Sequence, residues 1–468
     1  MTLWLELARC LLFLLPACSR LVAFGWLSTV ILGFCARRDL AGVSSLIRSG
    51  SLRPCVYRRL LHLFHSNAVR LEPLTQAWLA LVLRLFSPLT IGDRYVCLAD
   101  GIQVGKEGRK MPAVKSLYND SPDNSKARFI MGHAFHAVSL LVRSGTSRVL
   151  AIPLIARIDE GVIWPDEPRE SRPARLASLI CGLWTPLQKQ ILLVADAYFA
   201  AKTCIEPLRR QGHHIVTRVR LSTVAYRRPA PVRKRRRGRP RIYGKRVVLR
   251  NLFKRRPDFT RRKVEIYGEH VSLHFQLLDL IWKPLRASVR FVLVRLPDHR
   301  ETIFMTTDLS LSAEQIIQLY SYRFKIESGF KQAKHTLGAY AYHFWMMDME
   351  PLRRGSGDQN LLPRSDTYRA AVARKLAAYH RFVQAACIAQ GLLLHLSTNH
   401  SEQVWRSFRG WLRTIRPGLP PSEAVVAESL RSTAFEISLA KDELPLPLKF
   451  LRQHVDHSQL PDWLKRAA

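Results

Sequence analysis

The feature that most constrains this chain is a pair of apolar runs that each end in an aspartate. "RYVCLAD" ends at Asp100 and "QILLVAD" ends at Asp196. Short, continuous apolar runs of this kind are typical of buried strands. Three more strand candidates are "FIMGHAFHAVSLLVR", "SRVLAIPLIARI" and "HHIVTRVRL", and helical patterns occupy "PARLASLICGLW" and about residues 200–210. This order predicts a mixed α/β sheet with helices on its faces.

The two aspartates are candidates for one shared site. Open α/β sheets carry their sites at the carboxyl ends of strands, so Asp100 and Asp196 can meet there. Glu327 could supply a third carboxylate. Three adjacent carboxylates repel one another, and oxygen-only ligands favour hard cations such as Mg²⁺ or Mn²⁺. Taken singly, an Asp at a strand end is more often a turn or cap residue, and a helical Glu is usually solvated.

The segment "YSYRFKIESGFKQAK", residues 320–334, has an unusual distribution of charge. A helix predicted to begin near Ser312 would place one narrow polar stripe beside an apolar stripe that should be buried. The polar stripe consists of Tyr320, Arg323, Glu327 and Lys334. One acid among three groups that can bind phosphate is unexpected on a plain solvated face.

The charge balance points to a polyanionic partner. The chain has 468 residues with 73 Lys+Arg against 36 Asp+Glu, a formal net charge of +37. Nucleic acid fits this excess best, because neutralising phosphates releases condensed counterions; a merely basic surface and an acidic membrane are the alternatives. Residues 227–263 hold 18 Lys/Arg and one acid. Within them, Arg237 and Arg239 match the core of an AT-hook, although a basic loop that contacts DNA backbone is the preferred reading.

The N-terminal region, residues 1–88, reads as helical. Its run 11–36 is apolar, but Pro16 and Arg20 interrupt it, and the unbroken part from Leu21 to Ala36 is shorter than a membrane-spanning helix. Buried helices are therefore expected, with a membrane segment as the alternative. Residues 38–64 read as two short helices, either a helix-turn-helix variant or an ordinary helical cap.

Cysteine, histidine and tryptophan give no independent sign of a site. The eight cysteines form no C-x-x-C pair, which argues against a zinc site or a disulfide framework and favours a reducing cytosol. His133 and His136 are expected to pack or to form hydrogen bonds. Trp345 and Trp405 are expected in the core.

Three blocks together resemble the bacterial insertion-sequence DDE transposases. Tyr320, Arg323, Glu327 and Lys334 match the Y-(2)-R-(3)-E-(6)-K signature of that family at every position. "LADGIQVGKEGRKMPAVKSLYND" with "NSKARFIMGHAF" is similar to the family's region around the first catalytic Asp, and "LLVADAYF" to that around the second.

The resemblance implies an α/β fold with a ribonuclease-H-like core and a β-rich insertion, flanked by helical N- and C-terminal regions. It implies that Asp100, Asp196 and Glu327 are catalytic and bind two Mg²⁺ ions, for which Mn²⁺ can substitute, and that Tyr320, Arg323 and Lys334 contact DNA. The expected segments are a helical DNA-binding region at 1–88, core parts at 89–225 and 286–345, a basic insertion at 226–285 and a helical region at 346–468.

The expected function is that of a DNA transposase. It would hydrolyse phosphodiesters at the terminal inverted repeats of its element and join the freed 3′-hydroxyl to target DNA. We expect a homodimer on double-stranded DNA in the bacterial cytoplasm, associated with the nucleoid and not with a membrane. The alternatives are a metal-dependent endonuclease that does not join ends, and a non-catalytic DNA-binding protein derived from a transposase.

Overall fold

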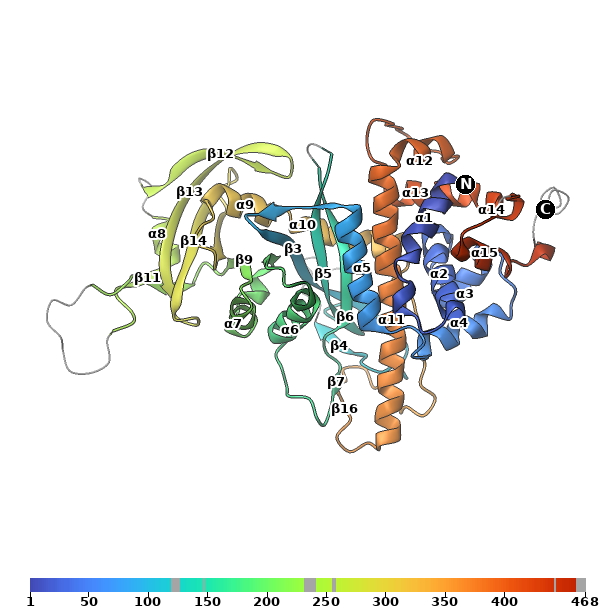
Figure 1. The fold of residues 1–468 in the computed structure, drawn as a ribbon. Helices are drawn as coiled ribbons and strands as arrows, with labels where there is room; N and C mark the ends of the chain where they lie inside the picture. The colour runs from blue at the N-terminus through green and yellow to red at the C-terminus, as the bar shows by residue number, and fades with distance from the viewer. Residues whose placement is uncertain (119–126, 146–147, 231–240, 255–257, 442, 460–468) are drawn as a thin grey trace. The chain divides into compact units, whose positions relative to one another are not determined.

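The computed structural model describes residues 1–118, 127–145, 148–230, 241–254, 258–441 and 443–459 (Figure 1). The chain forms two compact units, each built from separated stretches. The first unit contains Met1–Pro88, Gly101–Arg169 and Ser328–Ala468, and the second contains Leu89–Asp100 and Glu170–Glu327. Arg237 and Arg239 lie outside the described residues, so the AT-hook reading stays a prediction.

The N-terminal part of the first unit is helical, as predicted. Its helices are α1 (Thr2–Leu12), η1 (Leu15–Ala17), α2 (Leu21–Ala36), α3 (Gly42–Ser49), α4 (Val56–His65) and α5 (Leu71–Leu85). The apolar run at α2 is a buried helix, because most of its side chains are packed inside the unit, Phe24 and Val30 completely. Within the described part of the chain, no helix has the length and hydropathy that crossing a bilayer requires.

A 34-residue helix, α11 (Asp366–Asn399), is central to the helical part of the first unit. It packs against α1, α2, α4, α5 and α13, as the orange helix beside the blue ones shows in Figure 1. Ser365 caps its N-terminus by accepting a hydrogen bond from the Tyr368 amide, which satisfies one orphan donor. The remaining C-terminal helices are α12 (Ser401–Ser407), α13 (Glu423–Thr433), α14 (Phe435–Leu439), α15 (Leu446–Arg452) and η5 (His457–Gln459).

The strands of the first unit surround the hairpin of β5 (Phe129–Ser144) and β6 (Arg148–Ile158). β5 also pairs with β1 (Ser87–Pro88) and β4 (Lys115–Tyr118). β6 packs on α11, which buries one face of the hairpin. A separate parallel pair consists of β7 (Val162–Ile163) and β16 (Gln359–Asn360).

The second unit contains β8 (Ile191–Ala195), which Asp196 follows directly, and the part of β3 (Arg94–Gly105) that leads to Asp100. The expectation that a strand ends at Asp100 is wrong, because β3 continues to Gly105. β3 begins in this unit and runs on into the first, β8 lies parallel to it, and β9 (His214–Val219) lies parallel to β8. β2 (Thr90–Ile91) pairs with the start of β3. α6 (Arg172–Trp184), η2 (Thr185–Leu187), η3 (Ala197–Phe199) and α7 (Lys202–Arg210) provide the helical connections. This is the strand–helix–strand order that the sequence predicts.

Strands that follow β9 in the chain extend the sheet of the second unit, some in the segment 226–285 expected as the insertion and others in the segment 286–345 expected as core. β15 (Glu301–Thr306) pairs antiparallel with β9, followed in order by β14 (Ala287–Arg295), β13 (Glu269–Trp282), β10 (Val224–Tyr226) and β11 (Arg246–Val248). β12 (Thr260–Ile266) joins β13 through a two-residue turn, and a one-turn helix, α8 (Leu249–Leu252), follows β11. Tyr267 and Gly268 both have positive φ in that turn, as a type I′ hairpin requires.

The helix predicted to carry the signature residues is interrupted. α9 (Ala313–Ser321) begins with a capping box between Ser312 and Gln315, as the sequence indicates, and α10 (Phe324–His335) follows after a turn. The prediction of one continuous helix is therefore wrong at Tyr322 and Arg323. Their amides bond the carbonyls three residues back, which tightens the chain into a turn.

The predicted fold class is confirmed. The described chain is α/β, with a large mixed sheet, a ribonuclease-H-like core, a β-rich insertion and helical N- and C-terminal regions. The described cysteines are all free, in agreement with the sequence analysis.

Candidate active site

Asp100 and Asp196 follow neighbouring positions on adjacent parallel strands. Tyr95–Ala99 of β3 align with Ile191–Ala195 of β8, so each aspartate comes one residue after the last aligned pair. Adjacent strands lie about 4.8 Å apart. The strand pairing therefore brings the two backbones together where the parallel pairing ends, although 95 residues separate them in the sequence.

The backbone of Asp196 is fixed by the next strand. Asp196 has extended backbone dihedrals and precedes the short helix η3. The Thr217 hydroxyl on β9 donates a hydrogen bond to the Asp196 carbonyl oxygen at 2.9 Å. Thr217 aligns with Ala195 in the β8–β9 pairing, which explains why its side chain reaches this carbonyl. Our sequence analysis missed Thr217, and only the register of two strands reveals it.

Tyr320 supports the carboxylate of Asp196. Its hydroxyl donates to Asp196 Oδ1 at 3.3 Å, and its ring packs 4.7 Å, centroid to centroid, from the ring of Phe304 on β15. Burial, and then the charge of Asp196, raise the pKa of the Tyr320 phenol to about 12. The phenol thus stays protonated at neutral pH and acts as a hydrogen-bond donor.

Arg323 joins the other two acids. One guanidinium nitrogen lies 2.7 Å from Asp100 Oδ2, and the other lies 2.5 Å from Glu327 Oε1. Burial by itself would lower the pKa of the Arg323 guanidinium. The negative charges of Asp100 and Glu327 have the larger effect, so the pKa is raised. Arg323 lies in the turn just before α10, the helix that carries Glu327, so the two side chains are four residues apart.

The site holds three carboxylates, and Arg323 pairs with two of them, Asp100 and Glu327. The side chains of these two acids are 18% and 41% exposed. In these conformations Arg323 occupies the space beside Asp100 and Glu327, and the three acids do not form a group with mutual ligand distances under 4.8 Å within the described chain. The donor set nevertheless suits a hard divalent cation, because all its ligands are carboxylate oxygens. A metal ion here would take the place of the guanidinium.

Lys334 lies on α10, in the part of that helix that belongs to the first unit. Its ammonium donates to the Gln103 carbonyl oxygen at 3.0 Å and is partly exposed. Lys334 thus ties α10 to the end of β3 while its charge stays accessible to water.

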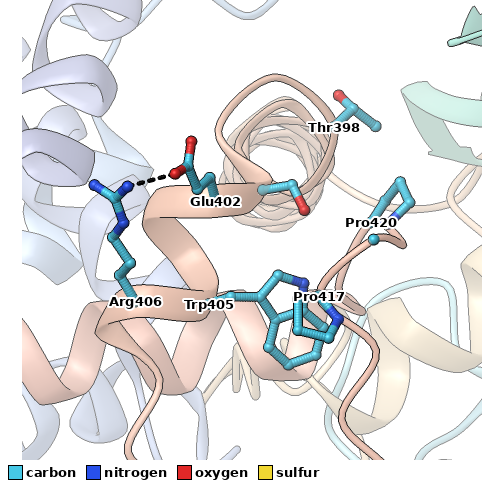
Figure 2. A pocket seen from close by; sticks show the side chains of 8 residues that line it. Thr398, Glu402, Trp405, Arg406, Pro417 and Pro420 are labelled. Atoms are coloured by element: carbon cyan, nitrogen blue, oxygen red, sulfur yellow. Dashed lines mark hydrogen bonds and ion pairs between the residues drawn. The ribbon is translucent and has the colours of Figure 1, made fainter.

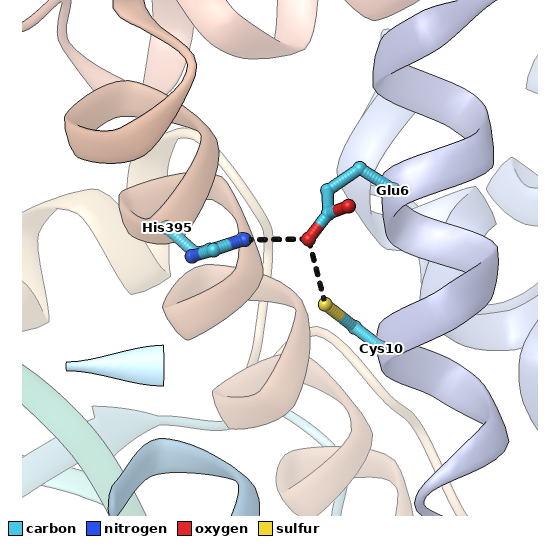
Figure 3. A group of neighbouring side chains, drawn as sticks. All are labelled: Glu6, Cys10 and His395. Atoms are coloured by element: carbon cyan, nitrogen blue, oxygen red, sulfur yellow. Dashed lines mark hydrogen bonds and ion pairs between the residues drawn. The ribbon is translucent and has the colours of Figure 1, made fainter. Parts of the chain in front are cut away.

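A second group of potential ligands occurs in the helical part of the first unit (Figure 3). Glu6, Cys10 and His395 are the one trio in the described residues whose ligand atoms all lie within 4.8 Å of one another. Glu6 Oε1 accepts from His395 Nε2 at 3.0 Å and from the Cys10 thiol at 3.7 Å. The contacts are those of a hydrogen-bonded cluster that fastens α1 to α11.

His133 and His136 on β5 form hydrogen bonds and pack in the interior of the first unit, as expected. His133 is buried and its Nε2 lies 2.9 Å from the Pro112 carbonyl oxygen, so that nitrogen carries the proton. Burial lowers the pKa of His133 to about 3. His136 Nε2 lies 3.1 Å from Asp159 Oδ2 in an equally buried pair. The expectation for Trp345 is wrong, because its side chain is 52% exposed, whereas Trp405 is half-buried.

Comparison with known proteins identifies the family. Residues 23–266 match the family described as DDE superfamily endonuclease, and this range is more than half of the chain. The chain therefore belongs to that family. The matched range includes Asp100 and Asp196 and ends before Glu327.

One solved structure is similar to this chain over most of its length. It is the piggyBac transposase in a synaptic complex with hairpin DNA, with 14% sequence identity and a TM-score of 0.38 over 95% of this chain and 74% of that one. No curated protein sequence matches.

Proposed function

We propose that this protein is a DNA transposase that uses divalent metal ions. The observation that carries the proposal is the pair of aspartates directly after the last aligned residues of two parallel strands, with Glu327 linked to Asp100 through Arg323. Family membership supports an endonuclease, and the signature match supports the narrower class, an insertion-sequence transposase of bacterial origin.

Asp100, Asp196 and Glu327 would hold two Mg²⁺ ions, for which Mn²⁺ can substitute. Bound there, such ions would activate a water or a 3′-hydroxyl and stabilise the oxygen that leaves the phosphodiester. The protein itself needs no covalent nucleophile. Its carboxylates supply the negative charge that retains the cations, and the β3–β8 pairing fixes the position of two of them.

The signature residues take separate roles in this proposal. Tyr320 is a positioning residue, because its hydroxyl orients the carboxylate of Asp196. Arg323 balances the acids until metal and DNA arrive, and its guanidinium then binds a DNA phosphate, for which its fork geometry is suited. Lys334 binds a phosphate as a point charge.

The proposed partner is double-stranded DNA, both the terminal inverted repeats of the element and the target. Two ends must be processed together, so we propose a homodimer on DNA. The helical region at residues 1–88 and the basic residues of the insertion would supply further DNA contacts, in keeping with the net charge of +37. The protein would act in the bacterial cytoplasm, at the nucleoid.

The test uses labelled duplexes that contain the DNA bordering the element on each side, with Mg²⁺ or Mn²⁺. We expect cleavage at the terminal phosphodiester, loss of cleavage in EDTA and, with target DNA present, covalently joined products. Wild-type cutting by Glu327→Gln would contradict the site assignment.

The second candidate is a metal-dependent endonuclease that cuts without joining. The family description, which names an endonuclease, favours this candidate. Cleavage without joined products on every target offered would select it over the transposase.

A further inference from the structure

A second surface of the first unit has the chemistry of a DNA contact. Residues 405–416, "WRSFRGWLRTIR", are called here the arginine–tryptophan segment. They contain four arginines, and no acid occurs anywhere from residue 403 to residue 422. The segment follows the start of α12 and lies far in sequence from the proposed active site. The DDE chemistry assigns it no role.

The ends of this segment are held in place. Trp405 is half-buried on α12, and its indole nitrogen donates to the Leu419 carbonyl oxygen at 3.1 Å. This bond closes residues 405–419 into a loop. Figure 2 shows the Trp405 ring beside Pro417 in a shallow pocket of about 590 Å³ that Thr398, Glu402 and Pro420 also line. The Ser429 hydroxyl on α13 donates to the Val404 carbonyl oxygen, which ties α12 to α13.

The middle of the loop presents an uncovered indole to solvent. Trp411 is 86% exposed, the largest exposed fraction among the large apolar side chains described, and Ile415 is 53% exposed. Most exposed apolar side chains in proteins are scattered singly and need no explanation. Here the indole stands among arginines.

The arginines around Trp411 differ from the arginine at the start of the segment. Arg406 pairs with Glu402 one helical turn away. Arg409, Arg413 and Arg416 are exposed, and the described residues offer their side chains no carboxylate partner. Three uncompensated guanidinium groups on one short loop favour a polyanion as partner.

The combination selects DNA over an acidic protein. Arginines bind phosphates bidentately, and an exposed indole stacks on the face of a base. We propose that the arginine–tryptophan segment is a DNA contact in which Arg409, Arg413 and Arg416 bind phosphates and Trp411 stacks on an unpaired base. This inference rests on the proposed function for the identity of the partner, and it adds a preference for DNA with unpaired bases.

Equilibrium binding of fluorescent DNA tests the proposal directly. The probes are a 30-base-pair duplex and the same duplex with a ten-nucleotide single-stranded end. Trp411→Ala should weaken binding of the single-stranded-end probe by about tenfold and of the plain duplex much less. Trp411→Phe, which keeps a ring, should restore most of the lost affinity.

Two controls separate this surface from general effects. Trp345→Ala removes another exposed tryptophan, one with no Lys or Arg within four residues on either side, and should leave both affinities unchanged. The double variant Arg413→Ala/Arg416→Ala should reduce the slope of log K against log salt by about 1.8 on duplex DNA. Arg210→Ala/Arg300→Ala removes the same charge from carboxylate-paired sites and should change the slope less.

The outcomes distinguish this inference from the proposed function. If the wild-type protein binds and cleaves DNA while Trp411→Ala and the Arg413/Arg416 variant bind as tightly as wild type, the inference is overturned and the function stands. If those variants lose affinity as expected but the wild-type protein never cleaves, the DNA contact stands and the enzyme assignment fails. Circular dichroism verifies that each variant is folded.

Discussion

The proposed active site and the Glu6 cluster differ in the partners of their carboxylates. At the proposed site Arg323 pairs with Asp100 and Glu327, and Tyr320 donates a hydrogen bond to Asp196. In the helical part of the first unit, one carboxylate accepts hydrogen bonds from His395 and Cys10. In our proposal the first arrangement leaves charge that a metal ion would neutralise, whereas the second is satisfied by its own hydrogen bonds. On that proposal one acidic group binds a ligand and the other stabilises the fold.

Removal of any one acid from the proposed site gives the largest expected effect. Asp100→Asn, Asp196→Asn and Glu327→Gln should each reduce DNA cleavage by about 10³-fold or more. The proposed cations would lower the free energy of the charged transition state by several kcal/mol, and each variant would weaken their binding. DNA binding should persist. Glu6→Gln is the matched control, and its cleavage rate per folded molecule should equal that of wild type. Cleavage assays on the four variants decide whether the two acidic groups differ in function.

The Glu6 variant should instead lose stability. Glu6→Gln removes a charged acceptor from a cluster where its side chain is 18% exposed, so the free energy of unfolding should fall by about 1.5–3 kcal/mol. Urea unfolding at pH 7 measures the loss. An unchanged midpoint would show that the cluster does not fasten α1 to α11.

Acid should destabilise the first unit through its buried histidines. Burial lowers the pKa of His133 to about 3, so the unfolded chain binds a proton near pH 6.5 while the folded chain stays neutral. Stability is therefore greatest above pH 6.5 and falls toward pH 3, by about 1.4 kcal/mol per pH unit for this one group.

The measurement for His133 is urea unfolding at pH 7 and pH 5. His133→Gln keeps a donor for the Pro112 carbonyl but does not titrate, so it should be less stable at pH 7 and less sensitive to acid. Equal pH sensitivity of variant and wild type would exclude His133 as a cause.

Arg323 should compete with metal for the acids. Arg323→Ala frees Asp100 and Glu327 from their guanidinium, so Mn²⁺ should bind more tightly, by about tenfold, and raise the melting temperature about 2–4 °C more than in wild type. Differential scanning fluorimetry across a Mn²⁺ titration measures this. Adding Glu327→Gln to Arg323→Ala should abolish the extra rise in melting temperature with Mn²⁺. If Mn²⁺ raises the melting temperature equally in the wild type and in both variants, the proposed metal site is wrong.

Lys334 should have the smallest effect. Lys334→Ala should weaken DNA binding a few-fold and reduce the salt slope by about 1, uniformly across DNA sequences. Binding isotherms at several salt concentrations measure the slope. A salt slope equal to that of the wild type would show that the Lys334 ammonium does not contact DNA and has only a structural role, its hydrogen bond to the Gln103 carbonyl oxygen.

The sequence alone predicted the parts of the fold that local pattern controls. The apolar runs before Asp100 and Asp196 are buried parallel strands, the run at residues 21–36 is a buried helix, and Ser312 caps a helix. The two strands and the buried helix follow from the length of their apolar runs, and the helix start at Ser312 follows from its capping residues. The position of Asp100 and Asp196 one residue past the last aligned pair of adjacent parallel strands also agrees with that pattern, and their sharing of a metal ion stays a prediction.

Only the tertiary structure decided where the long polar side chains go. The turn at residues 322–323 interrupts the predicted helix. The Arg323 side chain donates a hydrogen bond to Asp100, which is 223 residues away in the sequence. Tyr320 bonds Asp196. Trp411 is exposed while Trp405 is half-buried, although each adjoins arginine-rich sequence. Local pattern indicates the buried strands and helices, although it did not indicate the exposure of Trp345. The partner of a flexible polar side chain depends on residues distant in sequence, and no periodicity encodes that.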